Sequence, residues 1–339
     1  MEKKSVTVEG SAAVGNVSIP TDQLIQRIPE LAREGVTEFF LHDRTVAGNR
    51  KYLSSLIETV LANCPDMFLS LTVDLKLIDV PFIQKLSSIY CSIDIPLEGT
   101  EKAGGLLLDK KLYASKTRLL DRDGIVFGFV MGWGVQSGDT FKSFRDRLDF
   151  AVSLSPNHIE FPQFSAVPYS PAPTGFFSSK DMDFACGMAF ACRTFYTEGR
   201  AMPWFNAVIK PLHISPSAFF ADFDEWQQCN NCSLVTEYVP EDVSHQELEQ
   251  LQLRFLEEKY REKHKEHVFP AVRDFVVLNG AFSRVVEEDE ESVVETSYNP
   301  DDLLSPYSCN LEKFAEESTE EHCSVKVFAG EDAPDYRIL

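Results

Sequence analysis

Apolar runs of strand length recur along the first half of the chain at a nearly constant spacing. They begin near residues 5, 36, 67, 91, 124 and 158, mostly about 31 to 34 residues apart. Amphipathic helix patterns such as 49–63 lie between them. Repeated units of this kind need parallel strands and right-handed crossovers. The pattern predicts an α/β fold. We expect a partial (β/α)6 TIM-like barrel, with a doubly wound sheet as the alternative.

After the sixth strand pattern the rhythm stops. Residues 209–232 look loop-rich and aromatic, and 244–265 predict a strong helix, with Ser244 as N-cap and Glu247 completing a capping box. Two short strands are predicted at 268–277 and 282–298. We therefore expect two domains: the barrel at 1–215, and at 216–339 a C-terminal extension with helix 244–265 and an acidic small α/β region.

The net charge is strongly negative and unevenly spread. The chain has 53 acidic and 32 basic residues, a net charge of −21, and residues 286–339 hold 16 of the acids and three of the bases. Such a balance argues against binding to nucleic acid or to an anionic membrane surface. The acidic C-terminal region is either a solvated segment or a contact surface for a basic protein partner.

The expected compartment is the cytoplasm. No run of about 18 apolar residues predicts a membrane span, and the N-terminus lacks the pattern of a signal peptide. Eight cysteines in 339 residues are too sparse for a disulfide scaffold. We expect reduced thiols, either structural or metal-binding.

Polar side chains follow several of the predicted strands. Asp43, Asp74 and Glu98 come directly after the second, third and fourth strands, and Gln163 ends the sixth. Because parallel strands present their C-terminal ends at one edge of a sheet, these groups are candidate ligand contacts. Three carboxylates there need a cation, an amine or Arg44 to neutralise them. The alternative is that each acid caps the helix that follows it.

The order of several motifs resembles a known family. The segments are 26–44, Ser92–Thr100, Gly124–Gly128 and Pro168–Gly175. Together they resemble the core of the radical S-adenosylmethionine (SAM) superfamily over about residues 3–215, especially members associated with cobalamin-binding domains, although no such domain is visible here. The resemblance implies a pocket for SAM or a similar nucleotide, with Gly124 and Gly128 near its adenine and Asp43, Asp74, Glu98 and Gln163 as further cofactor-binding candidates.

One departure from that family bears directly on chemistry. Its [4Fe-4S] cluster is held by three cysteines, spaced C-x3-C-x2-C, after the first strand. Here residues 10–18 read GSAAVGNVS, without a cysteine, histidine or acid, and none of the eight cysteines elsewhere has that spacing. We therefore expect no cluster at the usual site and no reductive cleavage of SAM by the usual route.

The closest pair of cysteines is a second candidate site. Cys229 and Cys232 form a C-x2-C pair, which could contribute two thiolates to a zinc ion or an auxiliary cluster. The next pair, Cys186 and Cys192, has unusual spacing and diverges by about 120° on a helix. Inert, reduced thiols are the other interpretation of Cys229 and Cys232.

Three functional hypotheses follow. The first is a radical-SAM-like protein that lost the cluster ligands and is non-catalytic or repurposed, keeping a small-molecule pocket for a nucleotide or SAM. The second is an active enzyme that depends on a metal at Cys229 and Cys232 or on the carboxylates Asp43, Asp74 and Glu98. The third is a scaffold or regulatory protein that acts through the acidic C-terminal region.

Overall fold

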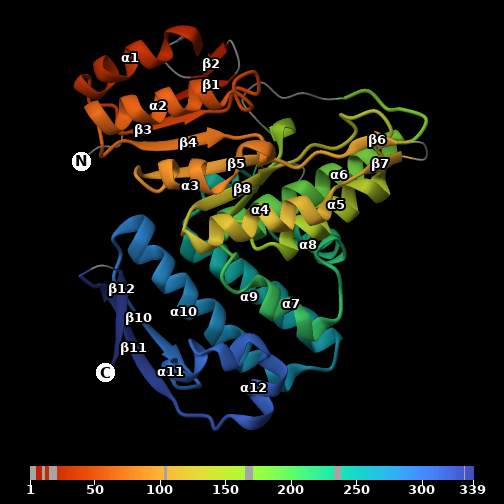
Figure 1. Ribbon diagram of the computed structural model, residues 1–339. Coiled ribbons are helices and arrows are strands. Elements are labelled where there is room, and N and C mark those ends of the chain that lie inside the picture. Colours follow the sequence, from red (N-terminus) through yellow and green to blue (C-terminus); the bar gives the residue numbers. More distant parts are fainter. Residues whose placement is uncertain are drawn as a thin grey trace. The chain divides into compact units, whose positions relative to one another are not determined.

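A computed structural model describes residues 5–9, 12–14, 21–102, 105–164, 171–232, 238–331 and 333–339. The chain divides into two compact units, residues 1–178 and 179–339 (Figure 1). The division falls before the boundary expected after residue 215. The reason is local packing, since helix α6 (Ser179–Cys192) packs against α8 (Pro216–Asn230).

Unit 1 is a mixed α/β unit built on one sheet. Its strand order is β2-β1-β3-β4-β5-β8-β9; β2 is antiparallel to β1, and every other pairing is parallel. The strands are β1 (Ser5–Glu9), β2 (Ala12–Val14), β3 (Glu38–Leu41), β4 (Phe68–Thr72), β5 (Cys91–Pro96), β8 (Val126–Val130) and β9 (His158–Glu160). All six predicted strands are present. The barrel is not confirmed, because among the described strands no pairing joins β9 to the β2 edge.

The helices of unit 1 follow the predicted alternation. They are α1 (Thr21–Arg33), α2 (Arg50–Asn63), α3 (Val80–Leu86), α4 (Lys110–Arg122) and α5 (Phe141–Ser153). A hairpin of β6 (Thr100–Lys102) and β7 (Gly105–Leu107) precedes α4. Asp109 determines where α4 begins, since its side chain caps the helix by accepting a hydrogen bond from the backbone N–H of Leu112.

The sequential order of the parallel strands places the helices on one face of the sheet. Each right-handed crossover moves one strand further in the same direction, so each helix crosses on the same side. Tyr113 of α4 packs edge-on against Phe129 of β8, and Phe144 of α5 contacts Phe161 just after β9. The helix-covered face is accordingly apolar, with Leu69, Leu71, Ile93, Ile95, Phe127, Phe129 and Ile159 buried.

Unit 2 is mainly helical and ends in a small antiparallel sheet. Its elements are α6, α7 (Phe205–Ile209), α8, α9 (His245–Glu262), α10 (Phe269–Glu288), α11 (Pro300–Leu303), α12 (Leu311–Glu317), β10 (Ser292–Thr296), β11 (Cys323–Ala329) and β12 (Pro334–Ile338). A π-helical turn, Arg193–Glu198, extends α6. Phe195 in this turn meets Phe219, Phe223 and Phe255 edge to face in the core. None of the described helices is long and apolar enough to cross a membrane.

Two predictions for this region were wrong. Residues 209–232, expected to be loop-rich, contain α8, whose N-cap is Ser215. The strands expected at 268–277 and 282–298 are largely the single helix α10, and only β10 remains of them. Their apolar residues look strand-like because α10 is buried on much of its circumference, which conceals the helical period. The predicted helix at 244–265 and its capping box are confirmed.

A buried charged group links α9 to α10. The guanidinium Nη1 of Arg284 donates to Glu249 Oε2 at 2.8 Å and lies 3.2 Å from Nδ1 of His245. All three side chains are buried. Gly280 makes room for this group, because a Cβ there would lie 2.0 Å from Glu249 Oε2. Burial and the positive charges of Arg200 and Arg284 lower the pKa of His245 to about 4.

The lowered pKa of His245 predicts a stability that depends on pH. Unfolded histidine has a pKa of about 6.5, so between about pH 6.5 and 4 the unfolded chain binds one more proton and the folded state loses stability as the pH falls. A shift of this size corresponds to about 3 kcal/mol. We expect His245→Gln to lose less stability than wild type as the pH falls, measured as the free energy of unfolding by urea denaturation from pH 7 to 4. His322→Gln, at an exposed histidine of the same unit, should leave the pH dependence unchanged. An unaltered dependence in His245→Gln would contradict the prediction.

Candidate functional site

The second face of the unit 1 sheet carries polar side chains. The register places Thr72, Asp94, Gly128 and His158 in one row across β4, β5, β8 and β9. Side chains alternate along a strand, so these residues point away from the helix-covered face. Ser70 and Ser92 lie one step earlier on the same face, and both are buried. A parallel sheet is usually apolar on both faces, so this polar row stands out as a candidate site.

Asp94 is the centre of this row. Its Oδ1 lies 2.5 Å from Nε2 of His158, and its Oδ2 lies 3.2 Å from Nε2 of His42. Ser70 Oγ lies 3.4 Å from both Asp94 Oδ2 and His42 Nε2. Asp94 is 2% exposed, whereas the side chains of His42 and His158 are 34% and 22% exposed. Solvent therefore reaches the imidazoles but not the carboxylate that orients them.

Asp94 is held as a carboxylate. Burial raises its pKa, but the hydrogen bonds and positive charges of His158 and His42 outweigh burial and hold the pKa well below its usual range. An ionised carboxylate accepts hydrogen bonds and donates none, so each Nε2 that bonds to Asp94 carries the proton. Asp94 thereby keeps the proton on Nε2 of both imidazoles and orients the rings, as the carboxylate partners of functional histidines do.

Gly128 makes the contact between Asp94 and His158 geometrically accessible. It lies on β8, between the strands that carry the two residues. A Cβ at Gly128 would lie 2.1 Å from His158 Nε2. The imidazole therefore crosses β8 over the one position that has no side chain, so Gly128 serves the close approach of another group.

The predicted strand-end acids lie in different environments. Asp74 and Glu98 line one cavity of about 270 Å³ together with Arg44, Lys76 and Tyr113. Arg44 donates to Glu98 at 2.9 Å, which supplies the neutralising partner considered from the sequence. Asp74 accepts from the backbone N–H of Lys76 at 2.9 Å, as a cap. Both roles, helix capping and cavity lining, therefore occur at this edge of the sheet.

Asp43 is buried and bonded locally. Its Oδ1 accepts from the backbone N–H of Thr45 at 2.8 Å and from the Thr45 hydroxyl at 2.7 Å. It is only 2% exposed, and it is not among the residues that line the cavity of Asp74 and Glu98. The geometry at Asp43 is that of a turn that orients its neighbours His42 and Arg44.

Gly124 and Gln163 lie at opposite ends of the sheet. Gly124 has φ +67 and lies in the turn between α4 and β8. It therefore precedes the N-terminal end of β8, whereas the cavity of Asp74 and Glu98 lies at the C-terminal ends of the strands. Gln163 donates through Nε2 to the carbonyl of Trp133 at 3.1 Å, just beyond the C-terminal ends of β8 and β9. The structure thus does not bring Gly124 together with Asp74, Glu98 and Gln163.

The cysteine pair lies at the end of α8. Cys229 is exposed and Cys232 is half-buried. Burial and the nearby carboxylate of Asp224 raise the pKa of Cys232 to about 11, which favours the thiol over the metal-binding thiolate. Across the described ranges, no group of three or more Cys, His, Asp or Glu side chains could hold a metal ion.

Sequence reasoning missed the group formed by His42, Asp94 and His158. Asp94 is separated by 64 residues from His158, so spacing rules for ligands do not apply. Two signals could have found it: an aspartate in the middle of the apolar strand CSIDIP and a glycine in the middle of the strand VFGFV. A buried acid needs partners, and a glycine inside a strand marks a close approach.

Comparisons with known proteins give weak likenesses. No protein-family model matches the chain, and no curated protein matches it. Among solved structures, the radical SAM methyltransferase TsrM from Kitasatospora setae, with cobalamin and a [4Fe-4S] cluster bound, aligns at 14% identity and a TM-score of 0.36, over 47% of this chain and 34% of that one. The carboxyl transferase domain (Y628A) of Rhizobium etli pyruvate carboxylase, with pyruvate, aligns at 12% identity and a TM-score of 0.32, over 93% and 49%.

The chain thus spans about a third of TsrM and about half of the carboxyl transferase chain. TsrM belongs to the superfamily that the sequence motifs resemble. Identities and TM-scores this low carry no conclusion about fold or function.

Substitution of Gly128 should break the contact between Asp94 and His158. In Gly128→Ala the new Cβ displaces the imidazole, and the buried carboxylate loses a donor, at a cost of about 1–3 kcal/mol in the free energy of unfolding. Because the folded-state pKa of Asp94 is lowered, this contribution is present above the unfolded pKa of about 3.9 and is lost as the pH falls below it.

The measurement is urea denaturation at pH 7 and near pH 3.5. The difference in the free energy of unfolding between Gly128→Ala and wild type should be clear at pH 7 and smaller near pH 3.5. Gly48→Ala is the matched control, since a Cβ at Gly48 meets its nearest atoms at 3.9 Å, an ordinary contact. A Gly128→Ala protein as stable as Gly48→Ala at pH 7 would show that the His158 contact contributes nothing.

Proposed function

We propose that this chain is a repurposed radical-SAM-like protein that binds a small polar molecule on the polar face of its sheet without an iron–sulfur cluster. The observation that carries the proposal is the ionised, buried Asp94 held between two part-exposed imidazoles. Ionisable groups arranged in this way on a sheet face are costly for folding and cluster at functional sites. His42 and His158 are the groups of this centre that a ligand would touch.

The cluster does not fit the residues present. Ala12, Ala13 and Val14 form β2, which pairs antiparallel with β1; the rest of 10–18 lies outside the described residues. None of these positions carries a thiol. Since three thiolates on one loop are needed to hold the cluster, the proposed function includes no reductive cleavage of SAM.

SAM itself is the first ligand to test, because the sequence resemblance extends over about residues 3–215 and includes the strand Gly124–Gly128. The role inferred for Gly128 from that resemblance, contact with adenine, competes with its contact to His158. A ligand on this face would therefore meet the imidazole of His158 at the position where the resemblance expects the base.

The experiment combines metal analysis with calorimetry. Anaerobically purified protein should contain no stoichiometric iron and show no visible cluster band. Titration with SAM, S-adenosylhomocysteine and adenosine should give binding heat for at least one of them. Affinity should fall about tenfold, or about 1.4 kcal/mol, in His42→Gln and in His158→Gln. Glu58→Gln, at an exposed carboxylate on α2, is the matched control. Stoichiometric iron would refute the loss of the cluster, and equal affinity in all three variants would refute the assignment to the polar face.

A second candidate function uses the carboxylates at the strand ends. Asp74 and Glu98 share one cavity with two cations, Arg44 and Lys76, which supports a carboxylate-dependent site there more than one that includes the buried Asp43. For Cys229 and Cys232, the raised pKa of Cys232 argues against a metal-dependent role. Ligand binding that is lost in Asp74→Asn and retained in Asp94→Asn, measured by the same calorimetry, would favour this second candidate.

The scaffold hypothesis places a protein partner on the acidic region. Several acids there already have partners within unit 2. Glu288 pairs with Arg200 at 2.7 Å, Glu291 pairs with Lys326 at 2.6 Å, and Glu290 accepts from Gln246 at 2.6 Å. A basic partner would have to compete with these contacts, so we rank this hypothesis below the other two.

A further inference from the structure

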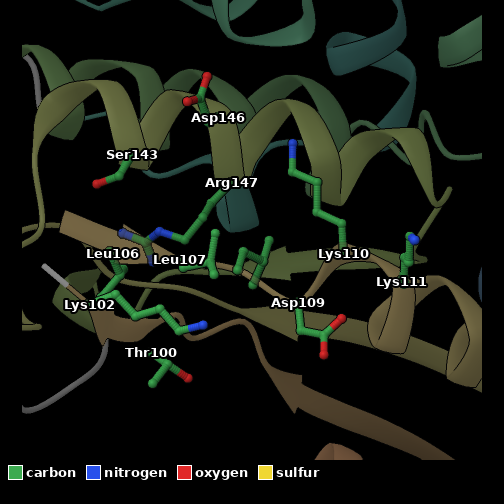
Figure 2. Close-up of a pocket in the computed structure, with 11 residues that line it drawn as sticks. Thr100, Lys102, Leu106, Leu107, Asp109, Lys110, Lys111, Ser143, Asp146 and Arg147 are labelled. Atoms are coloured by element: carbon green, nitrogen blue, oxygen red, sulfur yellow. The ribbon is translucent and has the colours of Figure 1, made fainter. Parts of the chain in front are cut away.

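A cavity of about 570 Å³ lies where the β6–β7 hairpin meets the N-terminal parts of α4 and α5. Figure 2 shows its lining. The residues are Thr100, Lys102, Leu106, Leu107, Leu108, Asp109, Lys110, Lys111, Ser143, Asp146 and Arg147. Arg147 reaches the carbonyls of Leu97 and Gly132, which follow β5 and β8, so the cavity lies at the C-terminal edge of the sheet on its helix-covered side.

The cavity is positive in a strongly negative chain. Three lysines and Arg147, which is paired with the buried carboxylate of Asp139, line it together with two aspartates, whereas the whole chain has a net charge of −21. Asp109 is already engaged, since it accepts from the backbone N–H of Leu112 at 3.0 Å. In Figure 2 the carboxylate of Asp146 points away from Arg147 and Lys102. Nζ of Lys110 lies over the Phe150 ring, 5.3 Å from its centroid, so Lys102 and Lys111 are the lysines whose charge is left to the cavity.

Arg147 supplies a buried donor. It is 4% exposed, and its Nη2 bonds to Asp139 at 2.8 Å and to the Gly132 carbonyl at 3.0 Å. Its Nε, which is buried, has no hydrogen-bond partner among the described residues. A buried N–H without an acceptor costs about 1–3 kcal/mol. Because this atom is closed to solvent, a ligand oxygen would reach it only if the Arg147 side chain turned toward the cavity, so the lysines are the accessible donors.

The remaining lining indicates the shape of that ligand. Lys110 and Lys111 are the first residues of α4, a helix of 13 residues whose N-terminal end favours negative charge. Leu106 and Leu107 form an apolar surface between Arg147 and Lys102 (Figure 2), and Leu107 is 53% exposed. An anionic group with several acceptor oxygens, attached to an apolar or planar body, matches both parts.

We propose that this cavity binds a phosphate-bearing small molecule. The phosphate oxygens accept hydrogen bonds from Lys102 and Lys111, and from Lys110 when its ammonium leaves the Phe150 ring. The body of the ligand packs on Leu106 and Leu107. This site is on the opposite face of the sheet from Asp94, and it does not depend on the function proposed for that face.

The test is calorimetry on the full chain with three probes: inorganic pyrophosphate, ADP and adenosine. We expect pyrophosphate and ADP to bind, ADP more tightly, and adenosine to bind at least tenfold more weakly than ADP. The triple variant Lys102→Gln, Lys110→Gln, Lys111→Gln should lose at least tenfold in affinity for both phosphate probes. These lysines are exposed, so the variant should fold, which its thermal unfolding curve checks. Raising the salt concentration should weaken binding, because exposed charges are screened.

Two control variants make the outcome specific. Lys51→Gln removes an exposed charge from α2 and should bind ADP like wild type. Lys142→Gln, at an exposed lysine of α5 that does not line the cavity, should also bind ADP normally. The proposal is overturned if neither phosphate probe binds at millimolar concentration, if the triple variant binds like wild type, or if adenosine binds as well as ADP.

Discussion

The one-way winding of the unit 1 sheet determines most of what this unit can do. Each parallel strand is added next to the previous one in sequence, with the β6–β7 hairpin inserted before β8. Right-handed crossovers then place the helices on one side. That side receives the apolar residues and forms the core. The other side of the sheet does not pack against these helices and need not be apolar. Asp94, His158 and the serines Ser70 and Ser92 lie on that side.

Much of the fold could be predicted from the sequence. The six strands and the helices between them occur where the sequence indicates, because a helix buried on one face leaves a period of 3.6 residues and a buried strand leaves a short apolar run. Whether the sheet closes into a barrel could not be predicted from these patterns. It depends on pairing between edge strands, and the antiparallel β2 is the outer neighbour of β1. Helix α10 was mistaken for strands since a helix buried on most sides loses its polar stripe.

The candidate site was predicted only in part. The rule that strand ends gather at one edge correctly brought Asp74 and Glu98 to one cavity. That rule could not show that the carboxylate of Asp43 bonds to Thr45 instead, since this contact depends on the local turn. The group around Asp94 joins residues of three strands and the loop after β3, all distant in sequence, and its geometry is set by the register of the strands. Alternation along each strand indicates which residues share a face, but the pairing of strands far apart in sequence is not readable from one sequence.

The contact across Gly128 has a consequence for related chains. An imidazole that lies over the backbone of a neighbouring strand ties two positions, 128 and 158, to one another, though 30 residues separate them in sequence. Any descendant that acquires a side chain at 128 must give up the imidazole at 158 or move β9, and a descendant that loses the imidazole no longer needs glycine at 128. Joint retention of glycine at one position and histidine at the other would mark the relatives that share this centre, even where the remaining sequence has diverged beyond recognition.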